Sequence, residues 1–302
     1  MKVTALAGGV GGAKLLIGLD QLEADTTAII NTADDAEMYG VHVCPDIDIC
    51  TYWLAGLADT ERGWGLQDDS FEVIDALGKL GVEDWFRLGD RDFATCLRRT
   101  DLLASGETLT GATELIRRAL GVQMALIPMS DDPVRTRIGT TDGRTLDFQE
   151  YFVKHRCEPG VAEVRFAGIA DAKPAPGVIE SIRSADLVVI CPSNPVVSIG
   201  PILALPEIRE TLIEHPRVAG VSPIIAGAAL KGPAAEMLGA QGEEVSAAGV
   251  AKLYSDLLDV FVVDLADRDH THAIEELGID VRVTDTVMTD AAASLRLASS
   301  LL

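Results

Sequence analysis

A glycine loop near the start of the chain, formed by Gly8, Gly9, Gly11 and Gly12, carries the clearest chemical signal. It follows a short apolar run and precedes a helical pattern that includes Lys14. Glycine lets the backbone approach an anion closely, and a helix N-terminus offers unpaired N–H groups with a partial positive charge. The loop therefore predicts binding of a nucleotide or another phosphorylated ligand, with Lys14 beside it. Its spacing matches neither the P-loop nor G-x-G-x-x-G, so a tight strand-to-helix turn is the alternative.

Four aspartates, Asp34, Asp35, Asp46 and Asp48, are the candidate metal ligands. Magnesium prefers carboxylate oxygens and bridges to the phosphates of a substrate. Asp46 and Asp48 point to one side of the chain if their segment is extended. Helix N-capping is the alternative reading of this pair, because a helical pattern follows at 49–57. Beside a phosphate loop, we expect Asp35, Asp46 and Asp48 to hold Mg²⁺.

Polar segments follow several apolar runs of the chain. Ser193 and Asn194 come directly after one such run, and they predict a second backbone pocket for a phosphate or a base. A simple turn is the alternative there. Ligands of open α/β sheets bind at the carboxyl ends of the strands. We therefore expect the polar segments to gather at one edge of a sheet; they span 31–35, 44–48, 128–133, 192–195 and 222–227.

Arg87 and Arg91 belong to a further polar segment, RLGDRD at 87–92. A guanidinium group both pairs with anions and stacks on rings, so either arginine could contact an anionic or aromatic ligand. The alternative is a plain loop in which Asp92 caps the next helix. Three tryptophans nearby predict either the wall of a pocket for a flat aromatic ligand or ordinary core packing; they are Trp53, Trp64 and Trp85.

The composition of the chain excludes several classes of function. Its 302 residues are 48% hydrophobic and 24% charged, and the net charge of −22 argues against a nucleic-acid partner. No apolar run is long enough to span a bilayer, and the N-terminus lacks a signal-peptide layout, so we expect a cytoplasmic protein with no membrane partner. The five cysteines show neither zinc spacing nor a disulfide framework. No G-x-S-x-G motif occurs, which argues against a hydrolase with a nucleophile elbow.

Short runs rich in valine and isoleucine alternate with helical patterns along most of the chain. Runs without polar alternation are typical of strands buried on both faces, and their alternation with helices predicts a doubly wound, mostly parallel sheet of Rossmann-like type. The expected strands are 3–7, 26–31, 123–128, 163–168, 186–191, 217–222, 260–264 and 280–284.

Two segments depart from this alternation within what we expect to be a single α/β domain over 1–302. The range 46–120 contains successive helical patterns and no clear strand, which predicts a helical insertion on the sheet. The range 134–153 reads as a β-hairpin, with strands at 135–139 and 144–152 and a turn between them.

In these motifs the chain resembles the 2-phospho-L-lactate transferases, the family that makes the deazaflavin coenzyme F-420 and whose bacterial branch uses phosphoenolpyruvate chemistry. The resemblance runs almost from end to end. The matching segments are AGGVGGAK at 7–14, NTADD at 31–35, CPDID at 44–48, GWG at 63–65, LGDRD at 88–92, PMSDDP at 128–133, PSNPVVSIGP at 192–201, SPII at 222–225 and DTVMT at 285–289.

The resemblance implies a transfer from a GDP-activated three-carbon acid, lactyl- or enolpyruvyl-2-diphospho-5′-guanosine, to the ribityl hydroxyl of the deazaflavin Fo, with release of GMP. It also implies Mg²⁺ and a homodimer. Asp48 and Arg87 then correspond to Fo-contacting positions, and we add Trp64 as a cover for the ring. A carboxylate accepts the hydroxyl proton, and we expect Asp48 in that role, with Asp35 second.

Two other functions are compatible with part of the sequence. A regulatory protein similar to the gluconeogenesis factors would bind a nucleotide sugar through the same kind of glycine loop. An NAD-dependent oxidoreductase would use Asp34 or Asp35 on the ribose, although the loop fits G-x-G-x-x-G poorly. Binding of GDP and Fo, of a UDP-sugar, or of NAD(H) distinguishes the three.

Overall fold

The computed structural model describes residues 1–22, 24–229 and 233–302. Its centre is a seven-stranded sheet in which every pair of neighbouring strands is parallel. This confirms the expected Rossmann-like architecture. The strands, in their order across the sheet, are β14 (Asp280–Thr284), β13 (Val260–Asp264), β10 (Val218–Val221), β9 (Leu187–Ile190), β1 (Lys2–Ala7), β2 (Asp25–Ile30) and β5 (Ala125–Pro128).

The order of the strands reverses between β1 and β9. From β1 the chain proceeds outward through β2 to β5, whereas from β9 it proceeds in the opposite direction through β10 and β13 to β14. Such a switch point leaves a crevice beyond the carboxyl ends of the two strands. The glycine loop follows β1 and the Ser193 segment follows β9, so the topology brings both to this crevice.

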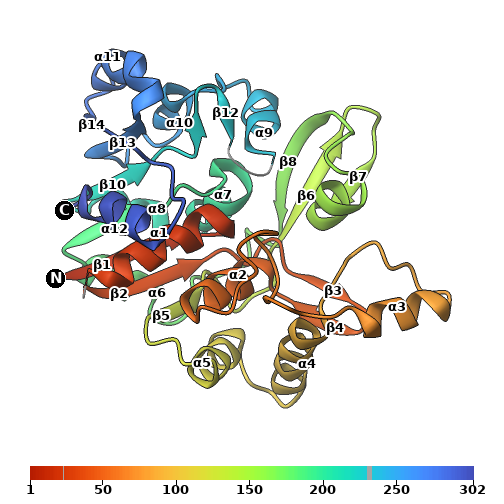
Figure 1. The fold of residues 1–302 in the computed structure, drawn as a ribbon. Coiled ribbons are helices and arrows are strands. Elements are labelled where there is room, and N and C mark those ends of the chain that lie inside the picture. Colours follow the sequence, from red (N-terminus) through yellow and green to blue (C-terminus); the bar gives the residue numbers. More distant parts are fainter. Residues whose placement is uncertain (23, 230–232) are drawn as a thin grey trace.

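Helices cover both faces of the sheet, as Figure 1 shows. Ala5 and Ala7 of β1 pack against helices on one face, and Leu6 packs against those on the other. The first face carries α1 (Gly9–Gln21), α2 (Pro45–Leu54), α5 (Leu109–Ala119) and α12 (Ala291–Ser299). The second carries α6 (Val178–Ser184), α7 (Gly200–Ala204), α8 (Ile208–Ile213), α10 (Ala247–Leu253) and α11 (Thr271–Glu275). A further helix, α9 (Ala234–Ala240), packs against β8 (Val161–Ala167), outside the parallel sheet.

Residues 46–120 form four helices with different neighbours. α2 and α5 pack on the sheet, whereas α3 (Glu72–Lys79) and α4 (Asp90–Ala104) extend away from it with the hairpin β3 (Ala36–Met38) and β4 (Val41–Val43) (Figure 1). These outer elements share a small apolar core of their own. The hairpin was not among the expected strands, because each of its strands is only three residues long.

The predicted hairpin belongs to a three-stranded antiparallel sheet in the order β7-β6-β8. β6 (Arg135–Thr140) confirms its first strand, but the second strand ends early, at β7 (Thr145–Asp147), because Phe148, Tyr151 and Phe152 follow at helical spacing in a short helical segment, η1 (Glu150–Lys154). The strand expected at 163–168 is β8 (Val161–Ala167), which pairs with β6 instead of joining the parallel sheet.

The remaining elements are short. They are η2 (Pro195–Ile199), η3 (Leu265–His270) and the two-residue strands β11 (Ile224–Ile225) and β12 (Ala228–Ala229). Within the part of the chain that the structure describes, no helix combines the length and the apolar character needed to cross a membrane.

Candidate active site

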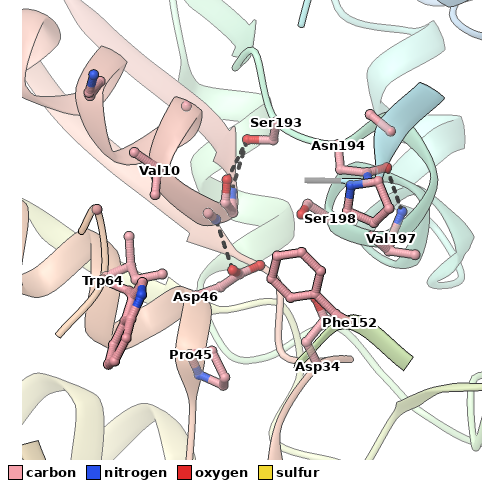
Figure 2. Close-up of a pocket in the computed structure, with 18 of the residues that line it drawn as sticks. Val10, Asp34, Pro45, Asp46, Trp64, Phe152, Ser193, Asn194, Val197 and Ser198 are labelled. Carbon is pink, nitrogen blue, oxygen red and sulfur yellow. Dashed lines mark hydrogen bonds between the residues drawn. The ribbon is translucent and has the colours of Figure 1, made fainter. Parts of the chain in front are cut away.

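A cavity of about 720 Å³ lies at the switch point of the sheet. Figure 2 shows Asp46 and Ser193 beside the glycine loop, with Trp64 and Phe152 on other walls. Residues from several polar segments of the sequence meet here, together with apolar and aromatic side chains. The lining includes Gly8, Gly9, Gly11, Lys14, Asp34, Asp46, Asp48, Arg62, Trp64, Phe86, Arg87, Asp92, Phe148, Phe152, Ser193, Asn194, Ser222 and Met288.

The glycine loop is in close contact with the segment that follows β9. Gly8 is the N-cap of α1, and its amide donates a hydrogen bond to Ser193 Oγ at 3.1 Å. A Cβ atom on Gly11 would lie 2.2 Å from the carbonyl oxygen of Pro192, and one on Gly12 would lie 2.8 Å from Ser193 Oγ. Glycine is therefore required at Gly11, where a side chain would meet backbone, and is favoured at Gly12, where it would displace the Ser193 hydroxyl. The N-terminus of α1 lies at the cavity.

Asp46 occupies the position beside this loop where an anion is expected. Its carboxylate accepts a hydrogen bond from the Gly9 amide at 2.8 Å (Figure 2) and another from Asn31 Nδ2 at 2.9 Å. Burial raises the pKa of Asp46 to about 6, although both hydrogen bonds act in the opposite direction. A phosphate at this loop must either displace the Asp46 carboxylate or share a cation with it.

The extended conformation considered for Asp46 and Asp48 is wrong, because α2 begins at Pro45 and both residues lie in its first turn. Side chains two positions apart on a helix do not face each other. Neither aspartate is the N-cap, which is Cys44. Asp46 contacts the glycine loop, whereas Asp48 points toward α4.

Asp48 forms a buried ion pair with Arg99 of α4. Arg99 is completely buried; its Nη1 lies 3.1 Å from Asp48 Oδ2, and its Nη2 contacts the other carboxylate oxygen. Burial raises the pKa of Asp48, and the guanidinium of Arg99 opposes this shift. Sequence analysis missed Arg99, since nothing in a single helical pattern distinguishes it from a surface arginine.

Asp92 is a second carboxylate next to Asp48. It lies inside the first turn of α4, so the expectation that it caps this helix is wrong; the N-cap is Gly89. Asp92 Oδ1 accepts a hydrogen bond from the hydroxyl of the buried Tyr52 at 2.8 Å. Burial, reinforced by the negative charge of Asp48, raises the pKa of Asp92 to about 7. This cavity wall therefore contains a carboxyl group that titrates near neutral pH.

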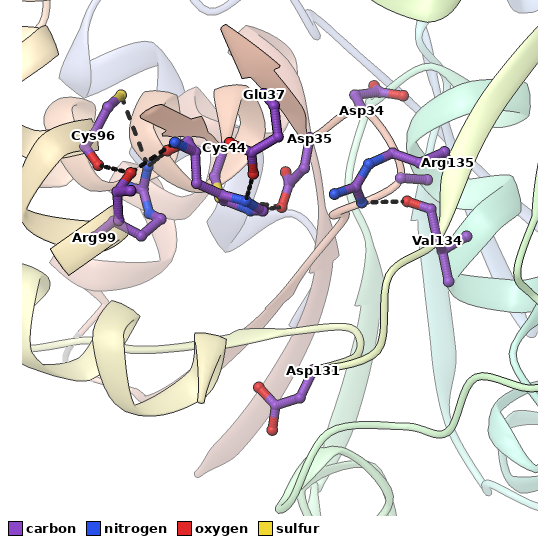
Figure 3. Close-up of polar contacts among 12 residues, drawn as sticks. Asp34, Asp35, Glu37, Cys44, Cys96, Arg99, Asp131, Val134 and Arg135 are labelled. Atoms are coloured by element: carbon purple, nitrogen blue, oxygen red, sulfur yellow. Dashed lines mark hydrogen bonds and ion pairs between the residues drawn. The ribbon is translucent and has the colours of Figure 1, made fainter. Parts of the chain in front are cut away.

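Asp34 and Asp35 point in different directions, although they are neighbours in the chain (Figure 3). Asp34 lines the cavity, and its Oδ2 accepts a hydrogen bond from Asn31, whereas its buried Oδ1 has no hydrogen-bond partner among the described residues. Burial raises the pKa of Asp34 well above its usual range. Asp35 is not among the described residues that line the cavity; it contacts His42 and Cys44 instead.

Lys14 and Asn194, two further residues predicted to bind phosphate, line the cavity and make specific contacts there. Lys14 donates a hydrogen bond to the carbonyl oxygen of Met288 at 2.8 Å and lies over the ring of Trp53. Asn194 Oδ1 accepts hydrogen bonds from the amides of Val196 and Val197, so it stabilises the helical turn that follows. The turn interpretation of this segment is therefore correct, and the same turn forms part of the cavity wall.

Aromatic and cationic side chains form a further part of the cavity lining, which we call the aromatic wall. Trp64 is 39% exposed and packs edge-on against Phe71, and the guanidinium groups of Arg62 and Arg87 both lie over the Phe71 ring. Arg87 also pairs with Asp75 at 2.7 Å. Phe148 and Phe152 stack in parallel with ring centroids 5.6 Å apart. Of the three tryptophans, Trp64 alone lines the cavity among the described residues.

Fold and site together define a class: a Rossmann-like α/β protein with an anion-binding loop at its switch point, a carboxylate rim and an aromatic wall. The model of the family described as 2-phospho-L-lactate transferase CofD matches residues 3–295. The chain therefore belongs to the 2-phospho-L-lactate transferase family.

Relatives with assigned activities agree with this membership. A phosphoenolpyruvate transferase of Streptomyces griseus is 45% identical over 306 residues, which cover 99% of this chain and 96% of the relative. A 2-phospho-L-lactate transferase of Methanosarcina mazei is 40% identical over 294 residues, covering 97% and 96%. The fold is also that of a UPF0052 family member from Bacillus halodurans, with a TM-score of 0.68, 16% identity and coverage of 99% and 98%. The chain is thus a transferase of this family.

Proposed function

We propose that this transferase moves a phospho-lactyl or phospho-enolpyruvyl group from a GDP-activated donor to the ribityl hydroxyl of the deazaflavin Fo, and releases GMP, in the synthesis of coenzyme F-420. The observation that carries the proposal is the composition of one cavity. Its lining combines an amide-lined loop at a helix N-terminus, aromatic and cationic side chains, and buried carboxylates.

The donor diphosphate binds at the glycine loop in this proposal. The N-terminus of α1 and the Lys14 side chain supply positive potential in a chain whose net charge is −22. The carboxylates beside the loop also suit Mg²⁺ as ligands. Asp34 has a buried oxygen without a hydrogen-bond partner among the described residues, and Asn31 donates hydrogen bonds to both Asp34 and Asp46. When bound, the ion would neutralise charge that develops on the diphosphate.

Asp34 and Asp46 are therefore the ligands that we propose for Mg²⁺. Of the three ligands expected from the sequence, Asp46 retains this role. Both oxygens of Asp48 are in contact with Arg99, and Asp35 contacts His42 and Cys44, away from the lining of the cavity.

The acceptor binds at the aromatic wall. A flat, electron-poor ring fits between Trp64 and the phenylalanines of this wall, and the guanidinium of Arg87 can stack on it or pair with its polar edge. Asp48, fixed by Arg99, is then placed to orient the ribityl hydroxyls by accepting hydrogen bonds from them.

The transfer forms one bond and breaks another at the same phosphorus. The acceptor hydroxyl oxygen attacks the phosphorus that bears the three-carbon acid, and the bond from this phosphorus to GMP breaks, with its electron pair leaving on GMP. The hydroxyl proton must go to a base. We assign this base to Asp92, whose acidic group lies within 4.8 Å of that of Asp48 and whose pKa is raised by burial to about 7.

Product analysis tests the proposal. The purified chain is incubated with Fo, Mg²⁺ and each of the two activated donors, and the products are identified by mass. We expect Fo to gain one phospho-acid group, with GMP released in equal amount, and the preferred donor identifies the acid. The proposal fails if neither donor reacts. It also fails if the chain binds a UDP-sugar or NAD(H) in preference to GDP and Fo.

We further propose a cytoplasmic homodimer, on the support of the family resemblance. The single chain has a mass of 32.0 kDa, so light scattering behind a sizing column should report about twice this value. A mass equal to that of one chain would contradict the dimer without affecting the assignment of the cavity.

A further inference from the structure

Asp35, His42 and Cys44 form a compact group outside the cavity. His42 Nε2 lies 3.4 Å from Asp35 Oδ2, Cys44 Sγ lies 3.1 Å from the same oxygen, and all three atoms are within 4.8 Å of one another. Successive side chains of a strand alternate between its faces, and Val43 of β4 lines the cavity, so His42 lies on the opposite face of the hairpin. Asp35 directly precedes β3, and Cys44 directly follows β4 as the N-cap of α2.

The spacing of these atoms suits a tetrahedral transition-metal site. Bonds of about 2.0–2.3 Å at tetrahedral angles place neighbouring ligand atoms roughly 3.4–3.6 Å apart. The two distances to Asp35 Oδ2 are within a few tenths of an ångström of this range. One nitrogen, one sulfur and one oxygen ligand form a borderline-soft set, which favours Zn²⁺ or Co²⁺ over Mg²⁺.

Glu37 provides the outer contact that metal-binding histidines typically make. Its Oε1 lies 2.7 Å from His42 Nδ1, so the Nδ1 proton is donated to this carboxylate (Figure 3). The neutral ring then has a lone pair at Nε2, directed at the lone pairs of Asp35 Oδ2. This contact is favourable only with a second proton on the ring or with a cation between the two atoms.

The burial of the group also calls for a cation. Asp35 and Cys44 are buried, and the Oδ1 atom of Asp35 has no hydrogen-bond partner among the described residues. The neighbouring group of Asp48, Asp92 and Cys96 differs, because the buried guanidinium of Arg99 already pairs with it. Arg99 donates a hydrogen bond to the backbone carbonyl of His42, and its charge also acts on Cys44, but its guanidinium pairs with Asp48 and not with Asp35.

We propose that Asp35, His42 and Cys44 bind one divalent transition-metal ion of the Zn²⁺ class, with Glu37 orienting His42 and water in the fourth position. The ion would join the residue before β3 to strand β4 and to the N-cap of α2, and Val43 of the same strand lines the cavity. This site is separate from the Mg²⁺ position at Asp34 and Asp46 and does not depend on the proposed reaction.

Metal titration of the full-length chain, first stripped with a chelator, tests the site. We expect one equivalent of Zn²⁺ to bind by calorimetry, and one equivalent of Co²⁺ to produce a thiolate-to-cobalt charge-transfer band. Cys44→Ser should abolish the band. Glu37→Gln alters an exposed side chain, so it should fold normally and lower the affinity by about 10–100-fold.

Cys157→Ser is the matched control, because Cys157 is a half-buried thiol outside the group, and it should keep the band. Circular dichroism checks that each variant is folded. Less than a tenth of an equivalent of Zn²⁺ on the unmodified chain would overturn the proposal. So would a cobalt spectrum that is the same in Cys44→Ser and in the unmodified chain.

Discussion

Asp48 and Asp92 are two neighbouring carboxylates with different surroundings. Asp48 contacts a buried guanidinium, which favours its charged form, whereas Asp92 contacts a tyrosine hydroxyl and faces the charge of Asp48. Environments of this kind separate the pKa values of a pair and divide its roles between a fixed anion and a proton acceptor. This division moves the proposed base from Asp48, which the sequence suggested, to Asp92.

The raised pKa of Asp92 predicts a pH-dependent stability. Its value of about 7 in the folded chain exceeds the ordinary 3.8, so folding favours the protonated form. The stabilisation is complete below about pH 4 and is lost as the pH rises through about 7. We expect the free energy of unfolding, measured with urea from pH 4 to 8, to decline less in Asp92→Asn than in the unmodified chain. Equal slopes would contradict the assigned pKa.

Asp48→Asn tests the role of the fixed anion. The change keeps the size of the side chain but leaves Arg99 buried without its counter-charge, and breaking such a pair costs about 3–5 kcal/mol of unfolding free energy. Turnover should fall far more than affinity for GDP, since Asp48 faces the acceptor. Urea melts and calorimetry with GDP measure the two effects; unchanged turnover in the folded variant would remove Asp48 from the mechanism.

Residue types and spacing in the sequence were enough to indicate the glycine loop, because a strand, a loop and a helix are contiguous there. They also selected Asp46 as one of two closely spaced carboxylates, although its contact with Gly9 joins residues 37 positions apart. They were not enough to indicate Arg99 or the pairing of Tyr52 with Asp92. These contacts join residues 51 and 40 positions apart, and only the packing of α4 against α2 brings them together.

At the scale of elements, the junction between α1 and the segment after β9 is the part of the site with the tightest packing. Backbone approaches backbone there, and a side chain on Gly11 would meet a carbonyl oxygen that has little room to move. The glycine loop is thus a requirement of strand–helix packing, which confirms the tight turn that the sequence offered as one interpretation. Anion binding at the same residues is part of the proposed function.

Gly11→Ala should therefore damage both stability and donor binding. Overpacking of this kind costs about 1–3 kcal/mol, and displacement of the loop should lower GDP affinity by about tenfold or more. Gly239→Ala is the control, because no atom lies within 4 Å of a Cβ built on this exposed helical glycine. The control should gain about 0.5–1 kcal/mol and bind GDP normally. Thermal melts and calorimetry would contradict this account if the two variants behaved alike.

The strands of the parallel sheet were predicted well from the sequence. All seven coincide with expected runs, and those at the centre of the sheet, such as β9, are continuous apolar runs because they are buried on both faces. The hairpin β3–β4 was missed because its strands are too short to show a period. β8 was expected as a strand, but it pairs with β6 in antiparallel orientation. A local sequence pattern does not indicate which strand will be the partner.

At the scale of the whole molecule, the acidic net charge and the anionic ligands of the proposed reaction pose a common problem. A chain with a charge of −22 repels a diphosphate at long range. The fold compensates locally by placing a helix N-terminus, Lys14 and the proposed Mg²⁺ position around the same cavity. We therefore attribute donor affinity to this site alone and not to the general field of the protein.

The helices of 46–120 fall into two groups, one on the sheet and one extending away from it. The helical patterns in the sequence did not distinguish the two groups. α2 and α5 complete a layer of the sheet, and α2 carries Asp46 and Asp48 into the cavity. α3 and α4 extend outward, and α4 carries Asp92 and Arg99. The site is therefore formed where the sheet layer meets the outer helices, a relation that depends on tertiary packing.

A crystal structure with GDP, Mg²⁺ and Fo bound tests the central claim most directly. We predict the diphosphate at the amides of Gly8 to Gly12, the ion at Asp34 and Asp46, and the Fo ring at the Trp64 wall with its terminal hydroxyl near Asp92. Density for the nucleotide or for Fo outside this cavity, or a terminal hydroxyl directed away from both Asp92 and the diphosphate, would contradict the account.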